Sequence, residues 1–167
     1  MAAKPHPTRF PEPGHDHGSC LGETLARAQS AFETKGLKFT PLRRRVLEEI
    51  AGSHRAVGAY AILERLAGQS EKRLAPISVY RVLDSLVEAG VVHRLESRNA
   101  YFACHAPHPG DRRQIVLACE RCSAVVELAG ESIFDGLSRA ATDAGFMVRL
   151  PMVEMLGTCG RCAASGV

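Results

Sequence analysis

The sequence lacks several features that would assign it to common protein classes. It has no uninterrupted run of about 18 apolar residues, which argues against a membrane span. Residues 1–20 lack the apolar centre of a secretory signal. No internal repeat, no His-Glu-x-x-His motif and no nucleophile motif of a hydrolase is present. We therefore expect a cytoplasmic protein that is not an enzyme.

A strong excess of charge is also missing, because the net charge of +3 is too small to indicate a nucleic-acid partner by itself. Its distribution is more informative. Residues 21–103 carry 13 basic and 9 acidic side chains, a balance of +4, whereas residues 104–167 carry 6 and 7, a balance of −1. The front part of the chain is therefore the expected binder of a polyanion.

What the sequence does contain is enough apolar material for a core and an unusual number of cysteines. Of the 167 residues, 46% are hydrophobic, which suits one ordinary domain or two small ones. Six cysteines could form three disulfides in a secreted protein. Without a signal sequence, paired cysteines are more often metal ligands or redox groups.

Helical periodicity and turn signals organise the front part of the chain. Residues 1–20 are rich in Pro, His and Gly and predict a flexible tail. Thr40 and Pro41 then supply a helix cap and a first-turn proline. Apolar stripes predict four helices, followed by a hairpin: residues 25–36, 42–50, 59–67 and 77–90, then strands at 91–95 and 100–104. This order predicts a winged helix-turn-helix domain over residues 21–104.

The remaining chain predicts a hinge and a small second domain. Residues 105–112 contain two prolines and a glycine and are interpreted as the hinge. Strands are expected at 115–118, 125–128 and 148–156, with a helix at 132–144. This α+β domain, residues 113–167, is too small to be stable alone, so a metal, a partner subunit or both are expected.

The strongest chemical signal is a pair of Cys-x-x-Cys motifs, formed by Cys119, Cys122, Cys159 and Cys162. Each chelating turn brings two sulfurs to one ion, so the two motifs predict a closed tetrahedral zinc site that holds the fold. The alternative is a redox dithiol, which usually needs one reactive pair and not two.

A second constellation comprises His93, Cys104, His105, His108 and Glu127. Pairing within the hairpin could bring His93 and Cys104 together, whereas Glu127 lies in a strand of the second domain. An ion held by such residues would fix the orientation of the two domains, as a metal switch requires. Sulfur, imidazole and carboxylate together suit zinc. The alternative is a buried cysteine with scattered surface histidines.

Other histidines carry a weaker signal. His15, His17 and Cys20 form a third group in the tail, where a His-x-His sequence is more often adventitious than selective. His6 and His54 have no nearby metal-binding pattern and are interpreted as surface residues.

The start of the fourth helix is the expected DNA reader, since recognition helices meet bases through their N-terminal residues. Arg81 could donate two hydrogen bonds to guanine, and Tyr80 could pack on a thymine methyl group or bond a phosphate. Ser78 lies on the same exposed face. The triplet Arg43, Arg44 and Arg45 would contact phosphates. The alternative is a solvated polar face on a core helix.

Three segments together resemble the ferric uptake regulator family. They are Leu37-Lys38-Phe39-Thr40-Pro41-Leu42-Arg43, Pro76-Ile77-Ser78-Val79-Tyr80-Arg81-Val82-Leu83 and Cys119-Glu120-Arg121-Cys122. The resemblance extends from about Leu21 to Cys162. Residues 92–104 are similar to the zinc uptake regulator branch, since iron-sensing members generally have an acidic residue where Cys104 stands.

The resemblance implies a homodimer that binds an inverted-repeat operator when zinc is plentiful and represses zinc-import genes. It implies that the second domain dimerises, that Tyr80 and Arg81 read bases, and that the four paired cysteines hold structural zinc. The regulatory ligands it implies are His93, Cys104 and Glu127, with a histidine downstream of Cys104. We therefore expect one structural and one regulatory zinc ion per subunit.

The sequence departs from the family pattern at two places. Arg112 stands where a relative has the downstream histidine, so His108 is expected to substitute, with His105 second. Residues 146–158 contain no histidine before the last cysteine pair, which makes a third metal site doubtful.

Three other functions compete with a zinc-responsive repressor. A sibling sensor of iron, manganese or peroxide is disfavoured by Cys104, because thiolate is a poor ligand for selecting Fe²⁺ or Mn²⁺. A thiol oxidoreductase or zinc hydrolase would be active without DNA. A zinc-stabilised interaction module would not depend on Tyr80 or Arg81.

Overall fold

The computed structural model describes Phe10 and residues 17–68, 74–104, 114–149 and 151–165. The chain divides into two compact units. One unit spans Pro11–His105, and the other combines Met1–Phe10 with Ala106–Val167. The predicted hinge at residues 105–112 and most of the predicted tail lie outside the described residues.

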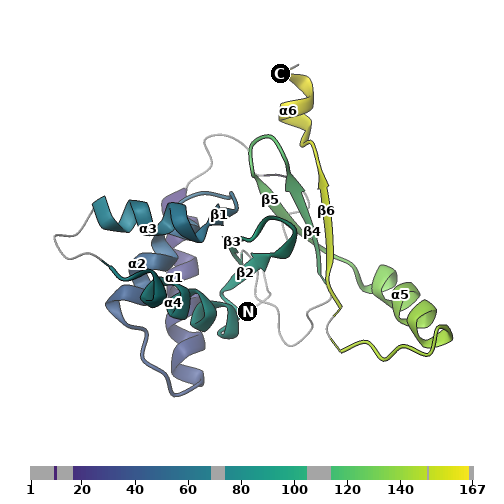
Figure 1. Ribbon diagram of the computed structural model, residues 1–167, viewed down its shortest axis with the longest axis horizontal. Helices are drawn as coiled ribbons and strands as arrows, with labels where there is room; N and C mark the ends of the chain where they lie inside the picture. Colours follow the sequence, from purple (N-terminus) through teal and green to yellow (C-terminus); the bar gives the residue numbers. More distant parts are fainter. Residues whose placement is uncertain (1–9, 11–16, 69–73, 105–113, 150, 166–167) are drawn as a thin grey trace. The chain divides into compact units, whose positions relative to one another are not determined.

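The unit spanning Pro11–His105, called the winged unit, combines four α-helices with a small three-stranded sheet (Figure 1). Its elements in chain order are α1 (His17–Thr34), α2 (Pro41–Ala51), β1 (Val57–Gly58), α3 (Ala59–Gly68), α4 (Pro76–Glu88), β2 (Val92–Leu95), the 3-10 turn η1 (Glu96–Arg98) and β3 (Ala100–Ala103). The three strands pair antiparallel in the order β1-β3-β2. Four helices followed by a hairpin confirm the predicted winged helix-turn-helix order.

The caps and apolar stripes of α2 and α4 act as the sequence predicts. The Thr40 hydroxyl accepts a hydrogen bond from the Arg43 backbone N–H at 3.3 Å, and Pro41 occupies the first turn of α2. Pro76 likewise occupies the first turn of α4, although the residue before it, Ala75, offers no side-chain cap. Both helices bury one stripe in a common core, formed by Val46, Leu47, Ile50, Val79, Val82, Leu83 and Leu86. The opposite face of α4 is therefore left toward solvent.

The hairpin of β2 and β3 sets the register of the wing. His93 pairs with Phe102, and Val92 pairs with Ala103. Asn99 closes the turn in the left-handed conformation at φ 47°, which asparagine tolerates better than most residues. The backbone N–H of Cys104 then donates to the carbonyl of Val91 at 3.0 Å, so the ladder continues one residue beyond β3.

Two features of the winged unit differ from the sequence prediction. Helix α1 begins at His17, whereas the predicted helical stripe began at residue 25 and the predicted tail ended at residue 20, so the last residues of that tail are helical. The last proline before α1 is Pro13. Within the first turns of the helix, the Thr24 hydroxyl donates to the Cys20 carbonyl at 2.9 Å. The strand β1 was not predicted, because two residues are too few for a period-two pattern.

The other unit, called the C-terminal unit, builds a three-stranded sheet. Its elements are β4 (Gln114–Cys119), β5 (Val125–Ala129), α5 (Glu131–Asp143), β6 (Val153–Gly157) and α6 (Gly160–Ala164). In the order β5-β4-β6, β4 pairs antiparallel with β5 and parallel with β6. Because β6 pairs with β4 in the register Cys119 to Gly157, the two Cys-x-x-Cys motifs follow neighbouring strand ends.

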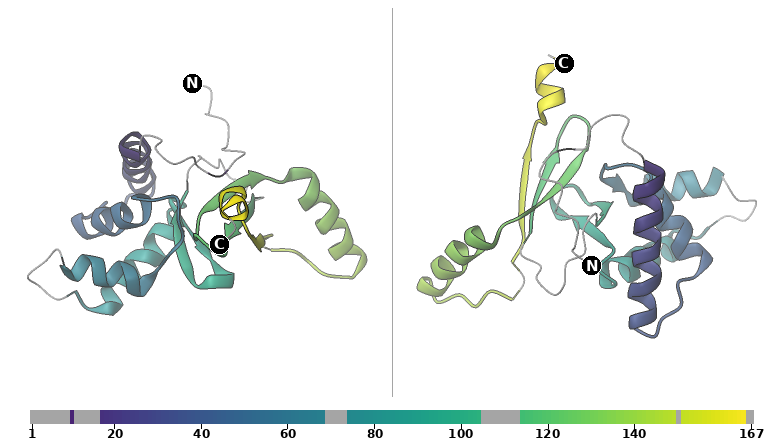
Figure 2. Two further views of the ribbon diagram at one scale, coloured as in Figure 1. Left: turned by 90° about the horizontal axis from the view of Figure 1, so that it is seen from above. Right: turned by 180° about the vertical axis from the view of Figure 1, so that it is seen from behind.

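Helix α5 lies beside one end of this sheet and does not cross its face (Figures 1 and 2). Phe134 is its buried residue, and Gly130 at the cap lets it approach β4. A Cβ at Gly130 would come within 2.9 Å of the Ile115 side chain. Ile133 and Leu137 remain about half exposed, at 50% and 49%.

The last strand starts later in the structure than the sequence predicts. The structure begins β6 at Val153, whereas the prediction began at residue 148. Pro151 lies between these positions and cannot donate a ladder hydrogen bond, which explains the later start. Among the described residues, no helix is long and apolar enough to cross a membrane.

Candidate metal centres and DNA-binding face

The four paired cysteines come together in the C-terminal unit, as their spacing predicts. Cys119 ends β4, and Cys122 lies in the turn that leads to β5. Cys159 caps α6, and Cys162 lies within that helix. Ser123 takes the left-handed conformation at φ 59° and closes the first turn, with its N–H donating to the Cys119 carbonyl at 2.9 Å.

The sulfur positions fit a tetrahedral ion. One Sγ from each cysteine lies within 4.8 Å of the other three, and the Cys122 and Cys159 sulfurs are 3.8 Å apart. Four thiolates around zinc, each at about 2.3 Å, stand about 3.8 Å from one another. Cys119 and Cys159 are 1% and 3% exposed. The cluster therefore has the number, type and spacing of ligands that a closed structural zinc site needs.

Backbone hydrogen bonds lower the pKa of two of these thiols and so favour their thiolate form. Burial raises the pKa of the Cys119 thiol, but backbone N–H groups, that of Cys159 foremost, outweigh it and lower the pKa to about 6. The Cys159 N–H lies 3.4 Å from the Cys119 sulfur. The backbone N–H of Cys162 likewise lowers the pKa of Cys159. Hydrogen bonding to Cys159 instead raises the pKa of Cys162 to about 12, so an incoming metal must displace that proton.

An apolar cover surrounds the cysteine cluster. Ala124 is buried with Cys119 and Cys159, and the ring of Phe10 packs against the same group. Phe10 falls within the predicted flexible tail, so this part of the prediction differs from the structure. No residue pattern around Phe10 indicates the contact, because the neighbours that it meets are more than a hundred positions away in the chain.

The second predicted constellation is divided between the units. His93 on β2 and Cys104 after β3 both belong to the winged unit, and a ring nitrogen of His93 lies within 4.8 Å of the Cys104 sulfur. Hairpin pairing thus brings these two together, as expected from the sequence. Cys104 is 4% exposed and His93 is half-buried. An imidazole and a buried thiol at this separation suit two ligands of one zinc ion.

Glu127 belongs to the C-terminal unit, on β5, and is 2% exposed. It pairs with Val116 of β4 in the sheet register. His105 and His108 lie outside the described residues.

The remaining predicted histidine group is only partly described. His17 and Cys20 lie on the first turn of α1, whereas His6 and His15 lie outside the described residues. His54 was interpreted as an isolated surface residue. Its ring is instead 5.1 Å from that of His17, measured between centroids, at an interplanar angle of 36°.

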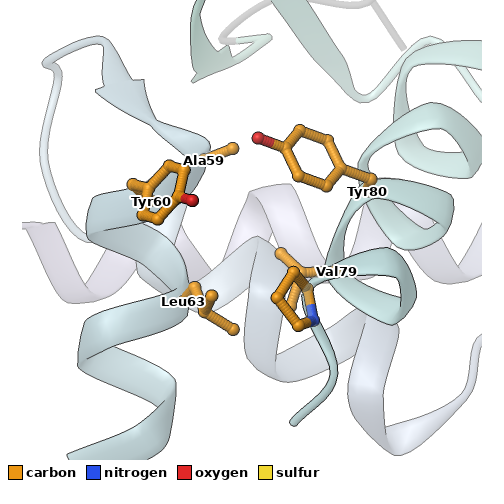
Figure 3. Close-up of a pocket in the computed structure, with 6 residues that line it drawn as sticks. Ala59, Tyr60, Leu63, Val79 and Tyr80 are labelled. Carbon is orange, nitrogen blue, oxygen red and sulfur yellow. The ribbon is translucent and has the colours of Figure 1, made fainter.

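The predicted DNA-reading residues occupy the first turns of α4. Tyr80 is 38% exposed, Arg81 is exposed and Ser78 is half-exposed. Figure 3 shows Tyr80 beside Ala59, Tyr60 and Leu63 of α3, where these residues line a small apolar groove with Val79 and Pro76. The ring of Tyr80 thus extends from α4 over the groove toward α3.

Tyr60 is a residue that the sequence interpretation missed. It is 74% exposed, although it stands in a helix whose other large apolar residues pack inward. The available signal was its position outside the stripe of Ile62 and Leu66. An exposed aromatic ring beside the expected DNA reader could pack on a thymine methyl group.

The arginine triplet is engaged in intramolecular contacts of different strength. Arg44 forms an exposed ion pair with Glu48 at 2.9 Å, and Arg45 donates to the Leu66 carbonyl at 3.4 Å. Arg43 makes more intramolecular hydrogen bonds than the other two arginines, because it donates to the Ser85 hydroxyl of α4 at 3.1 Å and also to the carbonyl of Lys38. Its role in the winged unit is therefore structural, whatever else it contacts.

The family of this chain follows from its similarity to known proteins. Residues 34–155 match the model of the ferric uptake regulator family. The chain belongs to that family. The match includes α4, the hairpin of β2 and β3 and the first Cys-x-x-Cys motif, and it contains all three segments that carry the resemblance in the sequence.

Within the ferric uptake regulator family, zinc regulators are more similar to this chain than an iron regulator is. The zinc uptake regulation protein of Escherichia coli strain K12 is 34% identical over 140 residues, covering 84% of this chain and 81% of that protein. The ferric uptake regulation protein of the same strain is 28% identical over 133 residues, covering 78% and 86%.

A solved structure of a family member agrees with this preference. The structure described as a zinc uptake regulator complexed with zinc and DNA aligns with a TM-score of 0.80 at 33% identity, covering 87% of this chain and 97% of that one.

Proposed function

We propose that this family member is a zinc-responsive transcriptional repressor, which binds operator DNA as a zinc-loaded homodimer and controls zinc-uptake genes. The observation that carries the proposal is the sulfur and imidazole pair of Cys104 and His93 at the end of the wing. The similarity to zinc uptake regulators supports it. Such a protein acts in the cytoplasm, where its operator lies, and has no catalytic role.

The proposed regulatory ligands are His93, Cys104, His108 and Glu127, with His105 as the alternative to His108. His93 and Cys104 supply a nitrogen and a sulfur from the winged unit, and Glu127 offers a carboxylate from the C-terminal unit. Together with the four paired cysteines, this set gives one structural and one regulatory zinc ion per subunit.

The proposed switch follows from the division of these ligands between two units. When all four residues ligate one ion, the winged unit keeps a single orientation relative to the C-terminal unit. When they do not, the chain between them allows many orientations, and affinity for the operator falls with the fraction of competent molecules. A dimer would then present its two recognition helices at the spacing of two half-sites only in the zinc-loaded state.

The proposed DNA contacts lie on one face of the winged unit. Tyr80 and Arg81 would meet base edges, with Ser78 beside them on α4. Arg43, Arg44 and Arg45 of α2 would contact phosphates and set the position of the unit on the duplex. Tyr60 is added to this face because of its exposure next to Tyr80.

The proposed homodimer is supported by apolar residues that the C-terminal unit leaves exposed. They are Ile133, Leu137, Phe146, Met147, Val148, Met152, Met155 and Leu156. Exposed apolar residues in this number are unusual on a small monomer and mark an interaction surface. Strand β6 also lies at the edge of its sheet, where a second chain can cover it.

The test is a mobility shift on inverted-repeat operator DNA at a series of buffered free-zinc concentrations. We expect wild-type protein to bind only when zinc is available, and Cys104→Ser to fail while it keeps its structural zinc. Cys20→Ser is the matched control, because Cys20 is a half-buried thiol outside both ligand sets. Equal binding by wild type and Cys104→Ser at all zinc concentrations would contradict the proposed switch.

The same assay separates the alternative, a sibling sensor of iron, manganese or peroxide. Such a sensor would bind the operator with Fe²⁺ or Mn²⁺ at concentrations where zinc is buffered away. The thiolate of Cys104 favours zinc instead, since Fe²⁺ and Mn²⁺ sites are usually built from nitrogen and oxygen ligands.

A further inference from the structure

Arg27 connects the first helix to the wing through a short series of hydrogen bonds. Its guanidinium group donates to the carbonyl oxygen of Cys104 at 2.6 Å and to the hydroxyl oxygen of Thr24 at 3.1 Å. Thr24 is 2% exposed, and its hydroxyl donates in turn to the carbonyl of Cys20 at 2.9 Å. A buried hydroxyl that both donates and accepts holds the guanidinium in one place.

These bonds fix Cys104 from both sides. Its N–H donates to the Val91 carbonyl at 3.0 Å, and its carbonyl accepts from Arg27 at 2.6 Å. Cys104 is the first residue after β3, so strand pairing alone does not hold its carbonyl. Where a sulfur lies depends on the backbone that carries it, and this backbone is held by a bond across 77 positions of the chain.

We propose that Arg27 is a positioning residue for the Cys104 sulfur and thereby sets the affinity of the regulatory zinc site. This inference rests on the proposed function, since it assigns Cys104 to that site. The Cys104 sulfur lies within 4.8 Å of a His93 ring nitrogen, and the bond from Arg27 holds the backbone that carries this sulfur. Pre-arranged ligands lose less conformational entropy when they close on a metal, so the site binds more tightly.

The effect of Arg27 on zinc affinity is one of geometry, because a cation beside the site would by its charge alone repel Zn²⁺. Both hydrogen bonds leave one nitrogen of Arg27, Nη2, whose two N–H groups are fixed in the guanidinium plane. A lysine would keep the charge, but its ammonium group rotates and lacks this fixed geometry.

The inference predicts a loss of zinc affinity that is confined to one site. The measurement is the dissociation constant of the second, more weakly held zinc ion of the full-length dimer, by competition with a chelator of known affinity. We expect Arg27→Gln to weaken this zinc ion about tenfold or more, the usual effect of removing a partner of a metal ligand. Arg27→Lys should recover part of the loss, and the zinc of the four paired cysteines should stay bound.

Two controls separate positioning from a general loss of stability. Arg65→Gln removes a cation from the same unit, where Arg65 makes only a long 3.9 Å ion pair with Glu49, and should leave the second zinc affinity unchanged. Co²⁺ in the second site gives a sulfur-to-metal charge-transfer band. In Arg27→Gln this band should weaken at full loading, which a purely structural role would not cause.

Each outcome has a definite meaning. If wild type binds no second zinc ion, the proposed function fails before Arg27 is tested. If wild type binds it and Arg27→Gln binds it equally well with the same Co²⁺ spectrum, the positioning role is wrong. If Arg27→Gln does not fold, the same dissociation constant is measured for Arg27→Lys and Thr24→Val. Binding of the second zinc ion as tightly as in wild type by both variants would overturn the inference.

Discussion

The guanidinium group of Arg43 joins three parts of the winged unit. It donates to the Ser85 hydroxyl at 3.1 Å and to the Lys38 carbonyl, and its carbon lies 4.7 Å above the ring of Phe32. Phe32 is completely buried, so the cation covers the edge of the core. Each hydrogen bond contributes about 0.5–1.5 kcal/mol, and a cation above an aromatic ring about 0.5–1 kcal/mol.

Arg43→Ala is therefore expected to lower the free energy of unfolding of the winged unit by about 1.5–4 kcal/mol. Urea titration followed by circular dichroism measures the change. Arg44→Ala is the matched control, because its ion pair with Glu48 is exposed and should contribute less than about 1 kcal/mol. Equal losses for the two variants would mean that the contacts of Arg43 do not stabilise the fold.

Single residues differ in how far the sequence reveals their role. The clustering of the four paired cysteines could be predicted from their spacing, since each Cys-x-x-Cys turn brings its own two sulfurs together. Cys104 and His93 required the hairpin register as well. Arg27 and Arg43 could not be assigned, because their partners lie up to 77 positions away and no local pattern encodes such a contact.

At the scale of elements, α5 has two unlike faces. Phe134 is buried against the sheet end, whereas Ile133 and Leu137 are four residues apart and half exposed. Residues with this spacing lie on the same side of a helix and form a short apolar ridge. In a homodimer that buries this ridge, a charge placed on it would be desolvated without a partner.

Leu137→Arg is accordingly expected to weaken the homodimer about tenfold or more, since burying a leucine contributes about 1.5–3 kcal/mol. Analytical ultracentrifugation over a dilution series measures the dissociation constant. Ser138→Arg, at an exposed polar position on the same helix, provides the control with the same added charge. An unchanged dissociation constant for Leu137→Arg would place the dimer interface elsewhere.

The longer elements were predictable because their signals act locally. Helices α2 and α4 start at a proline and carry a continuous apolar stripe, and their observed bounds lie within two residues of the predicted ones. The short elements β1 and α6 were not predictable. They have two and five residues and are held by a neighbouring strand and by the cysteine cluster, which local sequence cannot indicate.

For the whole molecule, the two proposed zinc sites imply two kinds of zinc release. The four paired cysteines lie in one unit, and two of their sulfurs are nearly inaccessible. Structural sites of this type contribute about 10–16 kcal/mol of apparent binding free energy at neutral pH. The proposed regulatory site draws its ligands from two units instead, so opening it requires only that the units separate.

Graded treatment with a chelator is therefore expected to remove zinc in two steps. The first step should release one zinc ion per subunit and abolish operator binding, with the far-ultraviolet circular dichroism and the dimer unchanged. The second step should release the other ion and unfold the C-terminal unit, because its small sheet has too little core to be stable without the metal. Zinc analysis, mobility shift and circular dichroism on the same samples follow all three quantities.

The order of loss is what distinguishes a switch from a pair of structural ions. If operator binding and helical signal disappeared together with the first ion, that ion would be holding the fold and could not serve as a reversible signal. If operator binding survived until the second ion left, orientation of the winged unit would not depend on His93 and Cys104. A regulator needs the weaker site to control DNA affinity while the stronger one keeps the dimer intact, since only then can a change in free zinc act without unfolding the protein.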